Sequence, residues 1–167
     1  MNKVFLGLGG NLGNRETYLS QAIKQINLEI GTVLNISDIF ESEPWCFEHH
    51  IPFLNQVIEV ETKLEALCVL DKCQQIEKSL GRERFLDGYR PRTIDIDVLF
   101  YNDFIYSLPP LIIPHKLLHQ RMFVLEPMAQ IAPDLVHPLF GISVKELKEA
   151  CTDTVKVWQY KPKMVGA

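Results

Sequence analysis

The stretch from Gly81 to Asp97, GRERFLDGYRPRTIDID, concentrates the charged side chains that phosphate chemistry requires. It places four arginines ahead of two aspartates. The planar fork of arginine pairs bidentately with phosphate oxygens, whereas carboxylates are suitable ligands for a hard divalent cation. The stretch therefore predicts a site for a metal-bound nucleotide.

The two aspartates, Asp95 and Asp97, alternate with Ile94, Ile96 and Val98. This period of two indicates a half-buried strand with both carboxylates on one face. Residues two apart on a strand are separated by roughly 6 to 7 Å, so both carboxylates can reach two metal ions about 3.5 to 4 Å apart. A lone Asp-x-Asp is more often a solvated strand face, but the arginines upstream favour a metal site.

The composition narrows the class of protein. The 167 residues are 47% hydrophobic and 23% charged, which predicts a single globular domain over residues 1–167. A net charge of -4 does not favour nucleic acid as a partner. The four cysteines lack C-x-x-C spacing, and neither a secretory signal nor a membrane-length apolar run is present. We expect a cytoplasmic protein with no membrane partner.

Alternating strand and helix patterns frame the charged stretch. The expected elements are a strand at Lys3–Leu8, a tight turn in the glycine-rich GLGGNLGN, a helix capped by Asn14, a strand at Val33–Glu41, a strand at Phe53–Glu61, a helix from Thr62 to Leu80, the Asp-x-Asp strand, a short helix near Arg121, and a frayed tail. A dinucleotide-binding interpretation of the glycines fails because Leu12 stands where a third glycine is required.

Within these elements, particular faces are predicted. In Phe53–Glu61, Phe53 and Asn55 face away from the side of the strand that carries its aliphatic residues, which makes them suitable for a flat heterocycle with amide-like edges. In the following helix, Thr62 and Glu65 have the spacing of a capping box. Its buried stripe is expected at Leu67, Leu70, Cys73, Ile76 and Leu80, with Gln74 and Glu77 pointing together from its flank.

The chain resembles the 6-hydroxymethyl-7,8-dihydropterin pyrophosphokinases of folate biosynthesis. The resemblance covers nearly the whole chain and is carried by GLGGNLGN, SEPW, FLNQVIEVET, QQIEKSLGRERF, PRTIDIDVLFY and IIPHKLLHQRMFVLEPMAQIAPDLVHP. It implies an α+β fold, a ferredoxin-like antiparallel sheet with helices packed mainly on one face. It also implies an enzyme that transfers pyrophosphate from MgATP to the pterin hydroxymethyl group and releases AMP.

The resemblance assigns roles residue by residue. Asp95 and Asp97 match the ligands of two Mg²⁺ ions. The catalytic loop cations of the family match Arg82, Arg84 and Arg92. Its ATP contacts match Gln74, Glu77, Arg84, Arg92, His115 and Arg121. Its pterin contacts match Ser42, Pro44, Trp45, Phe53, Asn55, Asp95 and Phe123. All these residues come from one chain, so we expect a monomer that binds only small-molecule substrates.

Some positions depart from common family members. Gly88, Tyr89 and Arg90 stand where many have a basic residue followed by Trp-Gly, Pro110 replaces a frequent arginine, and Lys116 replaces an aromatic residue. The alternative function is a ferredoxin-like module that stacks single-stranded nucleic acid on an aromatic sheet face. A sugar-nucleotide transferase that uses Asp-x-Asp is a more distant alternative, because the chain is short for that chemistry.

Overall fold

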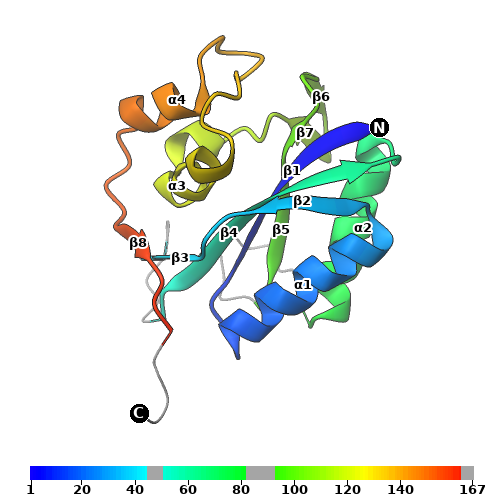
Figure 1. Ribbon diagram of the computed structural model, residues 1–167, viewed down its shortest axis with the longest axis vertical. Helices are drawn as coiled ribbons and strands as arrows, with labels where there is room; N and C mark the ends of the chain where they lie inside the picture. The colour runs from blue at the N-terminus through cyan, green and yellow to red at the C-terminus, as the bar shows by residue number, and fades with distance from the viewer. Residues whose placement is uncertain (45–50, 82–92, 163–167) are drawn as a thin grey trace.

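Figure 1 shows the computed structural model, which describes residues 1–44, 51–81 and 93–162. Along the chain the elements are β1 (Asn2–Gly10), α1 (Arg15–Glu29), β2 (Thr32–Ile36), β3 (Phe40–Ser42), β4 (Phe53–Thr62), α2 (Ala66–Ser79), β5 (Asp95–Tyr101), β6 (Tyr106–Leu108), β7 (Leu111–Ile113), the 3₁₀ helix η1 (Leu118–Gln120), α3 (Met122–Ile131), α4 (Val144–Ala150) and β8 (Val157–Gln159).

The main sheet has the strand order β5-β1-β4-β3-β8, and β2 also pairs with β4. Each of these pairings is antiparallel. Strand β1 lies between β4 and β5, with α1 following β1 and α2 following β4, which is the ferredoxin-like order. The predicted α+β class is confirmed, and the antiparallel neighbours of β1 exclude a parallel dinucleotide-binding unit.

Helices cover the sheet unequally. The two longest, α1 and α2, lie together on one face, while α3 and α4 pack against part of the other face (Figure 1). The first face is filled by aliphatic side chains such as Leu6, Ile58 and Ile96. The second core contains Phe5 and Phe100, which meet edge to face. Most of the helical mass is therefore on one side, as expected, and the uncovered part of the other face is available for a site.

Strand β5 changes its facing pattern at a β-bulge. Phe5 of β1 pairs with Phe100, but the next residue, Leu6, pairs with Val98, so Leu99 has no partner on β1. Leu99 and Phe100 consequently both belong to the core beneath α3 and α4. The bulge resets the alternation. In the residues of β5 before the bulge, Asp95 to Val98, the predicted alternation between the two faces holds.

The glycine-rich segment is part of a strand rather than a tight turn. Strand β1 continues through Gly10, and within the segment only Gly13 has a positive φ, of 67°. The expected turn is thus restricted to the residues after β1. Asn14 caps α1 as predicted, because its side chain accepts a hydrogen bond from Thr17 N at 3.2 Å.

Helix α2 begins later than its capping-box spacing predicted. Thr62 is the last residue of β4, and its hydroxyl donates to Ile30 O at 2.6 Å, while Glu65 is the N-cap without a side-chain bond. The buried side of α2 also differs from the predicted stripe, since Leu67 is 49% exposed and Val69 is buried. A tertiary partner for the Thr62 hydroxyl therefore replaced the predicted local cap.

The region after α3 contributes packing to the fold, and residues 163–167 of the predicted frayed tail, KPKMVGA, lie outside the described ranges. Strand β8 pairs with β3, placing Trp158 opposite Glu41. A capping box between Ser143 and Glu146 opens α4. Among the helices in the described ranges, none has the length and apolar character needed to cross a membrane.

Candidate active site

A pocket opens on the sheet face that α1 and α2 do not cover. The space between its walls, open mouth included, is about 620 Å³. Its walls come from β1, β3, β4, β5 and the start of α3. The lining residues are Gly7, Leu8, Gly9, Ser42, Glu43, Phe53, Asn55, Gln56, Val57, Asp95, Asp97, Leu99, Arg121, Phe123 and Val124.

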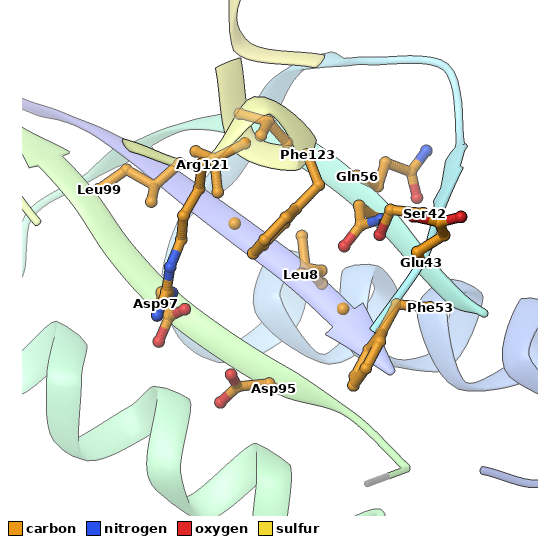
Figure 2. A pocket seen from close by; sticks show the side chains of 15 residues that line it. Leu8, Ser42, Glu43, Phe53, Gln56, Asp95, Asp97, Leu99, Arg121 and Phe123 are labelled. Atoms are coloured by element: carbon orange, nitrogen blue, oxygen red, sulfur yellow. The ribbon is translucent and has the colours of Figure 1, made fainter. Parts of the chain in front are cut away.

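The two aspartates occupy one side of this pocket. Asp95 and Asp97 project from β5 on the same side of the sheet (Figure 2). On the neighbouring strand they pair with Gly9 and Gly7, respectively. Glycine has no side chain, so β1 leaves open space beside each carboxylate. The sequence therefore placed the aspartates correctly, but it gave no reason for the glycines opposite them.

The aspartates fit an ion that obtains its other ligands from elsewhere. In the residues that the structure describes, no group of three or more histidine, cysteine, aspartate or glutamate side chains lies together as a metal site. Magnesium is commonly bound through one or two carboxylates, with water and substrate phosphates completing its octahedron. Asp95 and Asp97 on an open pocket wall match that donor set.

Arg121 brings a cation to the same wall. It immediately precedes α3, and Figure 2 shows its side chain extending across the pocket toward Asp97. Only 8% of the residue is exposed, and its guanidinium carbon lies 5.6 Å from the centre of the Phe123 ring. A buried arginine beside a carboxylate can bind a phosphate oxygen without losing its own charge compensation.

Two aromatic rings line the pocket beside this charged wall. Phe53 begins β4 and Phe123 lies in the first turn of α3, and both rings point into the cavity (Figure 2). Phe53 is 7% exposed, whereas Phe123 is only half-buried. Rings from two separate elements can receive a flat ligand between them. Tertiary folding brings together two residues that are far apart in the chain.

Asn55 of β4 also lines the pocket and is held in a defined orientation. Its Nδ2 donates to Ser42 Oγ at 2.8 Å and to Phe40 O at 3.3 Å. Both amide hydrogens therefore have acceptors within the protein. Oδ1 remains directed at the floor, where a Cβ added to Gly9 would lie 3.4 Å from it. The carboxamide thus presents an acceptor to a ligand that carries N–H groups.

Gln74 and Glu77 do not share the environment that we predicted. Gln74 is exposed, whereas Glu77 is 1% exposed and accepts a hydrogen bond from Ile96 N at 2.9 Å. Ile96 lies between Asp95 and Asp97. Glu77 therefore supports the aspartate strand from the α2 side of the sheet, while neither residue lines the pocket.

Replacing Glu77 with alanine is expected to lower the free energy of unfolding by about 1.5 to 3 kcal/mol, because the buried Ile96 N–H loses its acceptor. Glu77→Gln, which keeps an amide oxygen, should retain most of the stability. Urea unfolding without nucleotide measures both variants. Equal stability of Glu77→Ala and wild type would contradict this structural role.

His115 lies beside β5 but outside the pocket lining. Its backbone N–H donates to Leu99 O at 3.0 Å, and its Nδ1 accepts from Leu117 N at 3.2 Å. Burial, followed by the charge of Arg121, lowers the pKa of His115 to about 4, although Asp95 acts in the opposite direction. The ring is therefore neutral at pH 7 and carries its proton on Nε2, which is a donor.

This lowered pKa makes stability sensitive to acid. Between pH 6.5 and 4, His115 is protonated in the unfolded chain but still neutral in the folded protein. The free energy of unfolding therefore falls as the pH decreases through this range. His115→Gln should reduce the loss between pH 7 and pH 5 by about 1 kcal/mol, allowing for partial exposure of the ring. Urea unfolding at both pH values in the presence of a chelator measures the difference. An unchanged loss would contradict the prediction.

The remaining predicted site residues are placed as follows. Pro44 follows Glu43 at the rim and is not among the lining residues, and Lys116 is exposed. The predicted residues that lie outside the described ranges are Trp45, Arg82, Arg84 and Arg92, together with the divergent Gly88, Tyr89 and Arg90. Their assignments stay predictions.

Several lining residues were missed from the sequence. Gly7 and Gly9 form the floor, and a Cβ added to Gly7 would lie 3.3 Å from the Leu99 side chain. Their alternation with Leu6 and Leu8 in a strand was an available signal. Glu43 and Gln56 also contribute, but nothing in their local sequence distinguishes them from surface polar residues.

The geometry agrees with comparisons to known proteins. A model of the family described as 7,8-dihydro-6-hydroxymethylpterin-pyrophosphokinase (HPPK) matches residues 5–133, a range that includes the described residues lining the pocket. The chain belongs to the HPPK family. This membership confirms the resemblance found in the sequence, and it does not favour a nucleic-acid-binding module.

Relatives of similar length strengthen the assignment. The 2-amino-4-hydroxy-6-hydroxymethyldihydropteridine pyrophosphokinase of Aquifex aeolicus is 40% identical over 89% of this chain and 91% of its own. The Bacillus subtilis protein of the same name is 37% identical over 96% and 92%. By contrast, this chain spans only 20% of the Folic acid synthesis protein fol1 of Pneumocystis carinii, to which it is 40% identical.

Solved structures support the fold. An HPPK-DHPS crystal structure in complex with substrates superposes with a TM-score of 0.73 at 15% identity, covering 89% of this HPPK chain and 43% of the other. Wild-type HPPK-DHPS of Plasmodium falciparum with SDX-DHP gives 0.71 at 18% identity, with coverage of 89% and 43%. At these identities the likeness concerns the fold of the shared portion alone.

Proposed function

We propose that this HPPK chain transfers pyrophosphate from ATP to the hydroxymethyl group of 6-hydroxymethyl-7,8-dihydropterin and releases AMP, a step of folate biosynthesis. One observation carries the proposal. Two aspartates and a buried arginine share a pocket with an oriented carboxamide and two aromatic rings. The first group suits polyphosphate chemistry and the second suits a flat heterocycle with amide-like edges.

The pterin occupies the aromatic half of the pocket. Phe53 and Phe123 contact its two faces, and Asn55 Oδ1 accepts from its N–H groups while Ser42 and Phe40 hold the carboxamide. Selectivity follows, because a ring without those donors leaves a buried acceptor unsatisfied. Backbone near Ser42 and Pro44, with Trp45, completes the pterin contacts.

Asp95 and Asp97 hold Mg²⁺, and we propose two ions. When bound, the ions neutralise charge on the phosphate oxygens and lower the pKa of the pterin hydroxyl. The aspartates keep their positions because Glu77 holds the intervening Ile96 amide from below. Their placement next to the pterin half brings the hydroxymethyl oxygen close to the β-phosphate, so proximity supplies much of the rate.

Cationic and neutral donors bind the nucleotide. Arg121 reaches the phosphates from the pocket wall, and the Nε2–H of His115 donates to the nucleotide without adding charge. Gln74 contributes from α2, whereas Glu77, buried against the Ile96 amide, supports the aspartate strand from behind. Arg82, Arg84 and Arg92 complement the negative charge that moves toward the leaving AMP.

The enzyme works as a monomer of one domain in the cytoplasm, with ATP and the pterin as its only partners. Cys68, Cys73 and Cys151 are free thiols, as is usual in a reducing compartment. Burial raises the pKa of Cys73, so this thiol stays neutral and unreactive.

The deciding experiment mixes the protein with MgATP, with and without the pterin, and separates the nucleotides by chromatography. We expect AMP to form only when the pterin is present, in an amount equal to the pyrophosphorylated product. Omission of Mg²⁺ should stop the reaction. Formation of ADP, or AMP that is independent of pterin, would contradict the proposal.

A further inference from the structure

A polar cluster lies behind the pterin half of the pocket, where α1 meets β3 and the entry to β4. Arg15, the first residue of α1, donates through Nη1 to Glu41 Oε2 at 2.7 Å and to Pro52 O at 2.9 Å. The Arg15 and Glu41 side chains are only 21% and 17% exposed, respectively. This is a partly buried ion pair in which the same cation also binds a backbone carbonyl.

The cluster continues into the carboxyl-terminal strand. Trp158 of β8 donates from Nε1 to Glu41 Oε1 at 2.8 Å, so both carboxylate oxygens of Glu41 are occupied. The Arg15 guanidinium carbon lies 5.6 Å from the centre of the Tyr160 ring, and the Tyr160 hydroxyl donates to Glu16. The arginine is therefore held by contacts on several sides.

Each anchor of Arg15 adjoins a residue of the pocket. Glu41 precedes Ser42, Pro52 precedes Phe53, and Ser42 pairs with Phe53 across β3 and β4. Because alternate strand residues face opposite sides, Glu41 lies behind the sheet while Ser42 faces the pocket. A displacement of either anchor would move the Ser42 hydroxyl or the Phe53 ring, and through Ser42 the hydrogen bond to Asn55.

We propose that Arg15 is a positioning residue for the pterin, acting through Glu41 and the Pro52 carbonyl to fix Ser42, Phe53 and Asn55. The inference rests on the proposed function and deepens it. Arg15 itself does not line the pocket. A guanidinium suits this role because its planar Nη1 directs two hydrogens in fixed directions, one at the carboxylate and one at the carbonyl, whereas the lysine ammonium on its flexible stem holds such a pair less rigidly.

The first experiment compares Arg15→Ala, Arg15→Lys and wild type by steady-state kinetics and by equilibrium binding of the pterin without ATP. In Arg15→Ala, the KM and Kd for the pterin should rise roughly tenfold, with kcat and the KM for ATP within about twofold. Arg15→Lys should recover part of the affinity. Lys24→Ala removes an exposed cation from the same helix and should change neither constant.

The second experiment asks whether Arg15 acts through Glu41. Glu41→Gln alone should raise the Kd for the pterin. The double variant, Arg15→Ala with Glu41→Gln, should raise this Kd by a factor smaller than the product of the factors for the two single variants. Trp158→Phe, which removes one donor to Glu41, should have a smaller effect in the same direction. If Arg15→Ala does not fold, Arg15→Lys, Glu41→Gln and Trp158→Phe provide the same comparison.

The outcomes separate the two proposals. An active wild type whose Arg15→Ala variant binds the pterin normally overturns the positioning role alone. Equal increases in the KM for pterin and ATP, with a lowered urea midpoint, also overturn it, because they indicate general loosening of the fold. A wild type without pterin-dependent AMP formation overturns the proposed function together with this inference.

Discussion

Replacing Asp97 with alanine is expected to lower kcat by at least about a thousandfold, because the loss of one of two adjacent carboxylates removes the metal's fixed position on the pocket wall. Asp97 pairs with Gly7, so no neighbouring side chain on β1 can substitute for it. The measurement is AMP formation at saturating ATP, pterin and Mg²⁺. Asp97→Asn, which keeps the size but not the charge, should be nearly as inactive.

A matched control removes a carboxylate elsewhere. Asp103 lies in the exposed turn after β5, and Asp103→Ala should retain wild-type turnover. Urea unfolding confirms that each variant is folded before its activity is compared. An Asp97→Ala enzyme within threefold of wild type would show that the metal is bound elsewhere and would remove Asp97 from the proposed chemistry.

The second large effect is expected at Asn55. Asn55→Ala should raise the KM for the pterin by roughly 30- to 100-fold, since the substrate N–H groups lose their oriented acceptor and Ser42 loses its donor. The KM for ATP should change by less than about twofold, because the carboxamide belongs to the aromatic half of the pocket. Steady-state kinetics with each substrate varied in turn separate the two constants.

Asn35 offers a control of the same residue type. It lies on β2 of the same sheet, away from the pocket, and donates to Glu59 at 3.0 Å. Asn35→Ala should leave both KM values unchanged. If instead Asn55→Ala raised the KM for ATP as much as that for the pterin, the division of the pocket into an aromatic half and a phosphate half would be wrong.

Local alternation made part of the site predictable. Ile94, Ile96 and Val98 entered the core below α1 and α2, and Asp95 and Asp97 faced the other way, as their spacing required. The Phe53 and Asn55 face of β4 was predicted by the same reasoning. A strand with one buried side allows a single register, because a shift of one residue would bury the charged set.

Other features depended on residues far apart in the chain. The Thr62 hydroxyl bonds to Ile30 rather than capping α2, and the Glu77 carboxylate is buried against Ile96 rather than facing a nucleotide from the helix flank. In both cases local spacing predicted an exposed polar role. A tertiary partner decided the outcome, since a buried polar group without one is costly.

The sequence by itself determined the family, the strand faces and the combination of two adjacent carboxylates with aromatic and amide residues, because these depend on residue type and short-range alternation. Only the tertiary structure decided that Gly7 and Gly9 stand opposite the aspartates and that Arg121 enters the same pocket. It also decided that Trp158, 117 residues from Glu41, completes the cluster behind Ser42. The physical reason is that strand register and side-chain contacts between distant segments are settled by packing of the whole core.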